Sequence, residues 1–191
     1  MAVRIHLVII LMFVSFMTIS CAGSSAYMKP SEGFLSPTEE KALVRIMRPS
    51  GMGFGVNFNV LDGERVIGNS VAKSQFDYLA APGKHLFIAT AENKVFLEAD
   101  LEAGKTYYII TRIYPGVWRA RVAFLAVTKG SEYWDKVREY EAELVKLQPD
   151  TMAIKEWEDE NKQKIRELIT NYETTFKTSE VWPKLSREGG R

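Results

Sequence analysis

The chain has 191 residues, with 25 Lys and Arg against 24 Asp and Glu, so its formal net charge is +1. This balance leaves no basic excess of the kind that drives nucleic-acid binding, so we expect no nucleic-acid partner. The length suits one domain with a hydrophobic core and an appendage, and the single cysteine, Cys21, excludes an internal disulfide.

Residues 1–20 have the pattern of a signal peptide. Arg4 precedes an apolar run over residues 5–16, which is shorter than the roughly 20 residues that a membrane span needs. The sequence Thr18-Ile19-Ser20-Cys21 resembles a bacterial lipobox, with Thr18 where leucine is usual. The resemblance implies cleavage before Cys21, a diacylglyceryl group on its thiol and acylation of the new N-terminus. An ordinary signal peptide, or a single anchor helix with an incidental cysteine, is the alternative.

Lipid on Cys21 would hold the protein on a membrane. Several acyl chains, at about 0.8 kcal/mol per buried methylene, give lasting attachment without a spanning helix. Ala22 follows the cysteine where Asp would retain a lipoprotein at the inner membrane, which favours the outer membrane of a two-membrane bacterium, facing the periplasm. Residues 21–41, rich in Gly, Ser, Lys and Pro, predict a flexible spacer between the lipid and the fold.

Residues 42–128 alternate between apolar and polar side chains, as strands do. Val56, Phe58 and Val60 share one face, and Asn57 and Asn59 share the other. Turn sequences recur about every ten residues, and no helix of crossover length lies between them, so an antiparallel β-sandwich of seven or eight strands is expected. The glycine-rich stretch over residues 51–55 predicts a mobile loop or a sheet edge.

The turns of this segment carry a family resemblance. The motifs are Arg48-Pro49, Val60-Leu61-Asp62-Gly63 with Gly68, Ala81-Pro82-Gly83-Lys84-His85 and Ala103-Gly104-Lys105-Thr106-Tyr107-Tyr108. Together they resemble the bacterial lipoprotein family called domain of unknown function 2846, and they are similar to small PEGA-type sandwich repeats. The resemblance implies an immunoglobulin-like or transthyretin-like sandwich, and it implies no catalytic residues.

Residues 129–180 predict two helices. Tyr133, Val137, Tyr140, Leu144 and Leu147 form one helical stripe, which Pro149 ends. A second stripe continues to about Lys177, and the two helices could form a hairpin that packs on the sheet and projects beyond it. The members of this stripe are Ile154, Trp157, Ile165, Leu168, Tyr172 and Phe176. Residues 181–191 are expected to be a polar tail.

Few residues are candidates for chemistry. His85 is the only histidine after residue 20, and the only cysteine would carry lipid, so we expect no catalytic site, no metal site and no cofactor. Glu98, Asp100 and Glu102 alternate along one strand, and a solvated sheet face is the favoured interpretation over weak calcium binding.

Two groups of aromatic residues could bind a partner or ligand. On the second helix and just after it, these are Trp157, Tyr172, Phe176 and Trp182, and in the sheet region they are Tyr114 and Trp118. The first group could bind an envelope protein and the second could stack on sugars, although both could also be core residues.

The function expected from the sequence is that of a non-enzymatic envelope lipoprotein acting as an interaction or structural module, with the helices as its docking surface. The alternative is a module that binds glycan or peptidoglycan through the sheet aromatics. Burial of Trp157 and Trp182, together with exposure of Tyr114 and Trp118, would favour the glycan interpretation.

Overall fold

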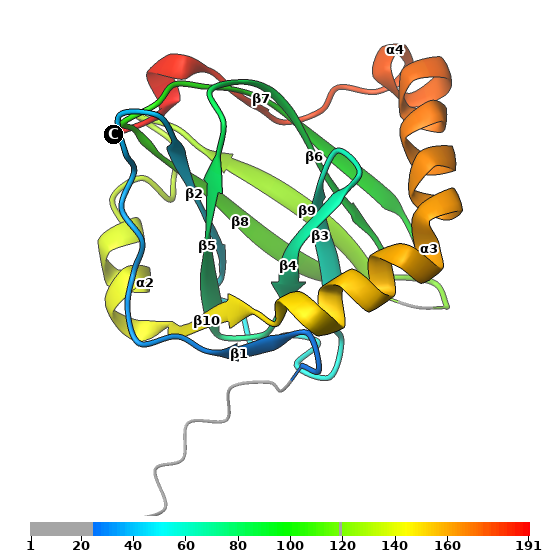
Figure 1. Ribbon diagram of the computed structural model, residues 1–191, viewed down its shortest axis with the longest axis horizontal. Helices are drawn as coiled ribbons and strands as arrows, with labels where there is room; N and C mark the ends of the chain where they lie inside the picture. The colour runs from blue at the N-terminus through cyan, green and yellow to red at the C-terminus, as the bar shows by residue number, and fades with distance from the viewer. Residues whose placement is uncertain (1–24, 119) are drawn as a thin grey trace, which may run out of the picture.

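The structure is a computed structural model in which residues 25–118 and 120–191 are described. The fold is mainly β, with two mixed sheets packed face to face and a long helix that follows them toward the C-terminus (Figure 1). The predicted signal peptide and Cys21 lie outside the described residues. The predicted sandwich with C-terminal helical structure is confirmed, whereas its immunoglobulin-like or transthyretin-like character stays a prediction.

The first sheet has six strands in the order β1-β10-β5-β2-β8-β9. Their bounds are Met28–Pro30 (β1), Ala42–Arg48 (β2), Ser74–Ala80 (β5), Thr106–Pro115 (β8), Ala120–Val127 (β9) and Val145–Pro149 (β10). Two neighbouring pairs, β2 with β8 and β10 with β5, run parallel, and the other pairs are antiparallel. The expected purely antiparallel arrangement is therefore replaced by a mixed one.

The second sheet has five strands in the order β11-β7-β6-β3-β4. Their bounds are Phe58–Asp62 (β3), Arg65–Ser70 (β4), Gly83–Thr90 (β6), Lys94–Leu101 (β7) and Lys184–Leu185 (β11). Only the short β11 runs parallel to its neighbour, β7.

The core between the sheets follows from the alternation of side chains along the strands. Phe58 and Val60 on β3 point into it together with Phe87 and Leu97 of the second sheet. The adjacent tyrosines of β8 separate as strand geometry requires: Tyr107 joins this core, and the next residue joins a smaller cluster on the outer face of the first sheet.

The first predicted helix is much shorter than expected. Only Val137–Glu143 forms a helix (α2), and Val145–Pro149 is strand β10, which pairs with the edge of β5. The Gln75 side-chain amide donates to the carbonyl oxygens of Tyr140, Glu141 and Leu144, at 3.3, 3.0 and 3.1 Å, where α2 ends. The predicted stripe over residues 133–147 is helical only at residues 137–143. It was wrong at residues 145–147, because the open edge of β5 offers ladder hydrogen bonds there.

The second predicted helix is confirmed as α3, Thr151–Asn171, continued by a π-helical turn, η1 (Tyr172–Phe176), and a short helix, α4 (Lys177–Ser179). Asp150 caps its start, accepting hydrogen bonds from the backbone N–H groups of Met152 and Ala153. The helix lies against the second sheet and does not form a hairpin with α2 (Figure 1). No helix among the described residues is both long and apolar enough to cross a membrane.

Both segments expected to lie outside the fold join it in the structure. Residues 28–30 of the predicted spacer form β1 and pair with β10. At the other end, Leu185 is buried, Arg191 exchanges backbone hydrogen bonds with Thr106, and residues 187–189 form a 3-10 turn, η2 (Arg187–Gly189). The polar tail is thereby docked along β7 and the start of β8.

Candidate functional site

One end of the sandwich gathers four chain segments, which we call the proximal end: residues 49–57, 71–73, 91–93 and 116–118. Strands β2 and β8 are parallel and both end there, while β5, antiparallel to β2, begins there. In the second sheet, β3 begins opposite the last residue of β4, and the turn between β6 and β7 points the same way. The segment after β2 leads directly into β3 and joins the two sheets at this end.

The described chain also begins at the proximal end. The Ser25 hydroxyl donates to Oδ1 of Asn69 at 2.9 Å, and Asn69 lies next to the last residue of β4. The Tyr27 carbonyl oxygen accepts a hydrogen bond from the Asp150 N–H at 2.8 Å. In Figure 1 this dark blue segment lies at the lower side of the sandwich, beside the cyan loop that follows β2. The first described residues therefore lie at this end of the sandwich.

A buried arginine holds the loop after β2. Arg48, the last residue of β2, is 1% exposed and donates to four backbone carbonyl oxygens. Its Nη1 contacts the carbonyl oxygens of Val56 and Ser70 at 2.7 and 3.2 Å. Its Nη2 contacts those of Met52 and Gly53 at 2.9 and 2.7 Å. Carbonyl groups near the start and near the end of the loop thus bind one rigid guanidinium group. These contacts hold the loop in one conformation, although the sequence suggested a mobile loop.

The burial of Arg48 has an electrostatic consequence. Its four hydrogen-bond acceptors are backbone carbonyl oxygens and not carboxylates, and desolvation lowers its pKa to about 10. Carbonyl dipoles and the face of the Phe58 ring, whose centroid is 5.9 Å from Cζ, compensate the charge, and Nε has no hydrogen-bond partner among the described residues. Burying a cation in this way costs free energy. The hydrogen bonds from Arg48 fix the conformation of a loop that contains no charged residue.

This loop presents large apolar side chains to solvent. Met52 is 57% exposed and Phe54 is 73% exposed. The backbone between them is fixed at Gly53, which has a φ of +62° and whose added Cβ would lie 3.0 Å from Cγ2 of Ile113 on β8. The left-handed φ suits glycine, and the close approach sets the loop against the end of β8.

The turn between β8 and β9 is a second exposed apolar segment at the proximal end. Trp118 is 91% exposed, and Val117 and Tyr114 are exposed beside it in the sequence. The Glu92 carboxylate accepts hydrogen bonds from the N–H groups of Val117 and Trp118, at 3.2 and 3.3 Å. A single side chain from the turn between β6 and β7 therefore holds this turn, as Arg48 holds the other.

The aromatic residues predicted to bind a partner pack on the protein itself. The rings of Tyr172, Phe176 and Trp182 surround Phe96 of β7, with centroid distances of 4.7, 5.7 and 5.0 Å. Trp157 packs against the same cluster. The outer face of the second sheet carries apolar residues that must be covered, and the helix covers them. Of the predicted docking residues, Tyr172 is therefore buried, and the other three are half-buried against this cluster.

Each ring nitrogen of His85 lies within hydrogen-bond distance of an acceptor oxygen. Its Nδ1 lies 2.7 Å from Oδ2 of Asp62, and its Nε2 lies 2.8 Å from the Ala81 carbonyl oxygen. The hydrogen bond to Asp62 is the main cause that raises the pKa of His85. Because both neighbours only accept, the ring fits best as an imidazolium that donates twice. Neither nitrogen is then available as a base, and the side chain serves to join β3 to the turn after β5.

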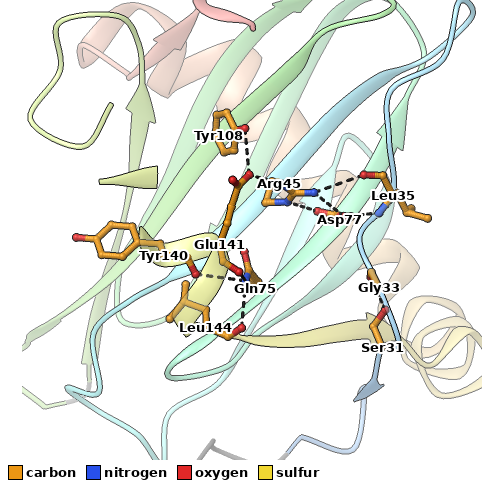
Figure 2. A network of polar contacts seen from close by, with 10 residues as sticks. All are labelled: Ser31, Gly33, Leu35, Arg45, Gln75, Asp77, Tyr108, Tyr140, Glu141 and Leu144. Carbon is orange, nitrogen blue, oxygen red and sulfur yellow. Dashed lines mark hydrogen bonds and ion pairs between the residues drawn. The ribbon is translucent and has the colours of Figure 1, made fainter. Parts of the chain in front are cut away.

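A network of polar contacts lies under α2, on the outer face of the first sheet (Figure 2). Arg45 contacts Asp77 through Nε at 2.7 Å and Nη2 at 3.0 Å, and it also pairs with Glu141 of α2. The Tyr108 hydroxyl donates to Glu141 at 3.1 Å, and desolvation, followed by this carboxylate, raises the pKa of Tyr108 to about 12. The Leu35 N–H completes the group by donating to Asp77 at 2.8 Å. Each charge has an opposite partner, so the cluster ties α2 and the N-terminal segment to the sheet.

A cavity of about 490 Å³ lies between β6, β7 and the π-helical turn. Glu98 on its wall bonds to the Tyr172 hydroxyl and to Lys184, and the Lys184 contact is the main cause that lowers the pKa of Glu98. Asp100 pairs with Arg187 at 3.0 Å. Glu98 and Asp100 are thus joined to the C-terminal segment, whereas Glu102 pairs with Lys105 at 2.7 Å. Within residues 25–118 and 120–191 no cluster of three or more metal-ligating side chains occurs.

No protein-family model matches the chain, and no curated protein or solved structure matches it either. The resemblance to the lipoprotein family therefore stays a prediction. Sequence reasoning singled out Tyr114 and Trp118 but missed Arg48 and Glu92 as the residues that hold the exposed loops. The signal available was the uncharged run over residues 49–61 with Met52 and Phe54 between glycines.

Proposed function

We propose that the protein is a lipoprotein of the bacterial cell envelope, anchored through lipid on Cys21 and acting as a non-enzymatic interaction or structural module. The proposal places it on the outer membrane, facing the periplasm, with an envelope protein as its partner. Its support is the lipobox-like sequence together with the place where the described chain begins.

The observation that carries the proposal is the attachment of Ser25 to the proximal end. Cys21 precedes Ser25 by four residues. Since an extended chain spans at most about 3.5 Å per residue, the lipid attachment point is within about 14 Å of the Ser25 backbone. A lipid at that point would hold the sandwich close to the bilayer and not on a long tether. Such an arrangement suits a module that works at the membrane surface.

The polar groups support a non-enzymatic role. His85 and the Arg45 cluster are held by partners that position strands and helices, so they are accounted for by structure. The solvent-facing side of α3 is charged, with ion pairs such as Lys155 with Asp159 at 2.8 Å. A partner that docks on this helix would meet charges and not the aromatic stripe that the sequence suggested.

A glycan-binding module is the second candidate. Its specific support is that Tyr114 and Trp118 are exposed while Trp157 and Trp182 pack against the sheet. Exposed rings can stack on sugars, as peptidoglycan binding would require. The flanking apolar residue, Val117, offers a sugar no hydrogen bond, which places this candidate second.

Metabolic labelling with an alkyne fatty acid tests the proposed function. The unaltered chain should carry the label and sediment with membranes, whereas Cys21→Ala should carry none. Ser24→Ala, a small change outside the lipobox-like segment, is the matched control and should label fully. Label retained on Cys21→Ala, or none on the unaltered chain, would show that the protein is not anchored in this way.

A further inference from the structure

We infer that the proximal end is a second membrane contact, in which the loop at Met52 and Phe54 and the turn at Val117 and Trp118 enter the lipid–water interface. The inference rests on the proposed lipid anchor and adds an orientation to it. The sandwich would stand on the bilayer with the proximal end down and the opposite end, which carries the hairpin between β3 and β4, toward the periplasm (Figure 1).

The two apolar loops and the first described residues lie at the same end of the sandwich. The parallel pairing of β2 with β8 places both loops at the same end of the first sheet. The close approach of Gly53 to Ile113 confirms that the loop after β2 lies against the last residues of β8. Ser25 is bound at this end too, and a lipid on Cys21 would bring the bilayer within a few residues of the fold.

The two loops have the residue composition of a membrane-interface segment. Residues 49–61 and 113–118 contain no Lys, Arg, Asp or Glu, in a chain of which 26% of the residues are charged. Trp and Tyr favour the membrane interface, because their rings combine an apolar body with a polar group. Met, Phe and Val bury well in the acyl boundary, to a depth of about 5–10 Å. A lipid surface is the occupant that satisfies both kinds of side chain at once.

Both exposed loops are held in place by hydrogen bonds with a single side chain each. Arg48 fixes one loop through the carbonyl oxygens of Met52, Gly53 and Val56, and Glu92 fixes the other through two backbone N–H groups. Burying a cation without an acidic partner costs free energy. The loop conformation that this cation fixes nevertheless leaves the side chains of Met52 and Phe54 exposed to solvent and not packed in the core. Large exposed apolar side chains on such loops mark an interaction surface.

Single engineered cysteines test the inference in the full lipidated chain. Because the chain has one cysteine, and lipid would block its thiol, an added cysteine is the only reactive one. Phe54→Cys and Trp118→Cys report on the two loops. Val181→Cys is the matched control, since Val181 is 98% exposed and closely follows α4, which lies at the top of Figure 1, away from the proximal end. Each variant is labelled with a polarity-sensitive maleimide dye and placed in vesicles of phosphatidylethanolamine and phosphatidylglycerol.

We expect blue-shifted emission and a severalfold loss of iodide quenching at positions 54 and 118, and neither change at position 181. Equal quenching at all three positions would overturn the inference while leaving the lipid anchor intact. Dye on the unsubstituted chain would mean a free Cys21 and would overturn the proposed function itself. Shielding of positions 54 and 118 by purified peptidoglycan sacculi, with none from vesicles, would overturn the membrane contact in favour of the glycan candidate.

Discussion

Replacing Arg48 should reverse the usual ranking of conservative and non-conservative changes. We compare Arg48→Lys, which keeps the charge, with Arg48→Met, which removes it. Lysine has three donors on a compact, strongly hydrated head, so it cannot reproduce the fork that reaches four carbonyl oxygens. Methionine leaves the carbonyl groups without their donor but also removes the buried cation.

The structure allows the magnitudes to be compared. Desolvation lowers the pKa of Arg48 from 12.5 to about 10, which corresponds to about 3 kcal/mol of cost that Arg48→Met would relieve. The same change leaves the Ser70 and Val56 carbonyl oxygens without this donor, at about 1–3 kcal/mol each. The two effects partly offset one another, so the outcome for Arg48→Met should lie between a gain of about 1 kcal/mol and a loss of about 3 kcal/mol in the free energy of unfolding. Arg48→Lys keeps the buried charge and loses part of the compensation, and it should lose about 2–4 kcal/mol more than Arg48→Met.

Urea unfolding of the mature chain, followed by circular dichroism, measures this ranking. Amide hydrogen exchange of residues 50–57 should accelerate in both variants, because both lose the guanidinium that holds the loop. Arg121→Lys, at an exposed position on β9, is the control and should change the free energy of unfolding by no more than about 0.5 kcal/mol. An Arg48→Lys protein as stable as the unaltered chain, or more stable than Arg48→Met, would refute the reasoning.

Two further predictions concern the second sheet. Phe96→Ala should lower the free energy of unfolding by about 3–5 kcal/mol and red-shift tryptophan emission, because the helix packs on this fully buried ring. The control is Phe54→Ala, at an exposed position, which should change neither quantity. A small loss for Phe96→Ala would show that other contacts hold the helix. Since the hydrogen bond from His85 to its carboxylate partner raises the pKa of His85 above 6.5, its stabilisation is complete below that pH and is lost as the pH rises through the folded-state pKa. Unfolding measured at about pH 6 and about pH 9 should therefore show a smaller loss in His85→Gln than in the unaltered chain, and an equal loss would contradict the assignment.

Local pattern was informative where one interaction decides the structure. The alternation of Phe58 and Val60 with their polar neighbours predicted a strand with one buried face, and the structure has it. The spacing of Ile154, Ile165 and Leu168 predicted a helix with one buried stripe, and these residues are buried. In both cases burial follows the period of the backbone, which sequence displays directly.

Pattern failed where a distant strand edge competed with local preference. Residues 145–149 continue a helical stripe, and they also alternate, with Val145 and Leu147 on one side of Lys146. The free edge of β5 resolves the ambiguity in favour of a strand, and β1 then adds to β10 for the same reason. Backbone hydrogen bonds to a strand far away in the sequence have no signature in the segment itself.

The sequence by itself determined the uncharged loops, the strand and helix periods, and the short distance along the chain between Cys21 and Ser25. Only the tertiary structure decided which aromatic residues face water: Tyr172 is buried against Phe96, whereas Trp118 is exposed. It also decided that Arg48 holds a loop and that two apolar loops share one end of the sandwich with the start of the described chain. The physical reason is that burial and neighbourhood depend on how the sheets pair and pack, and parallel pairing of β2 with β8 is a non-local choice that no single segment encodes.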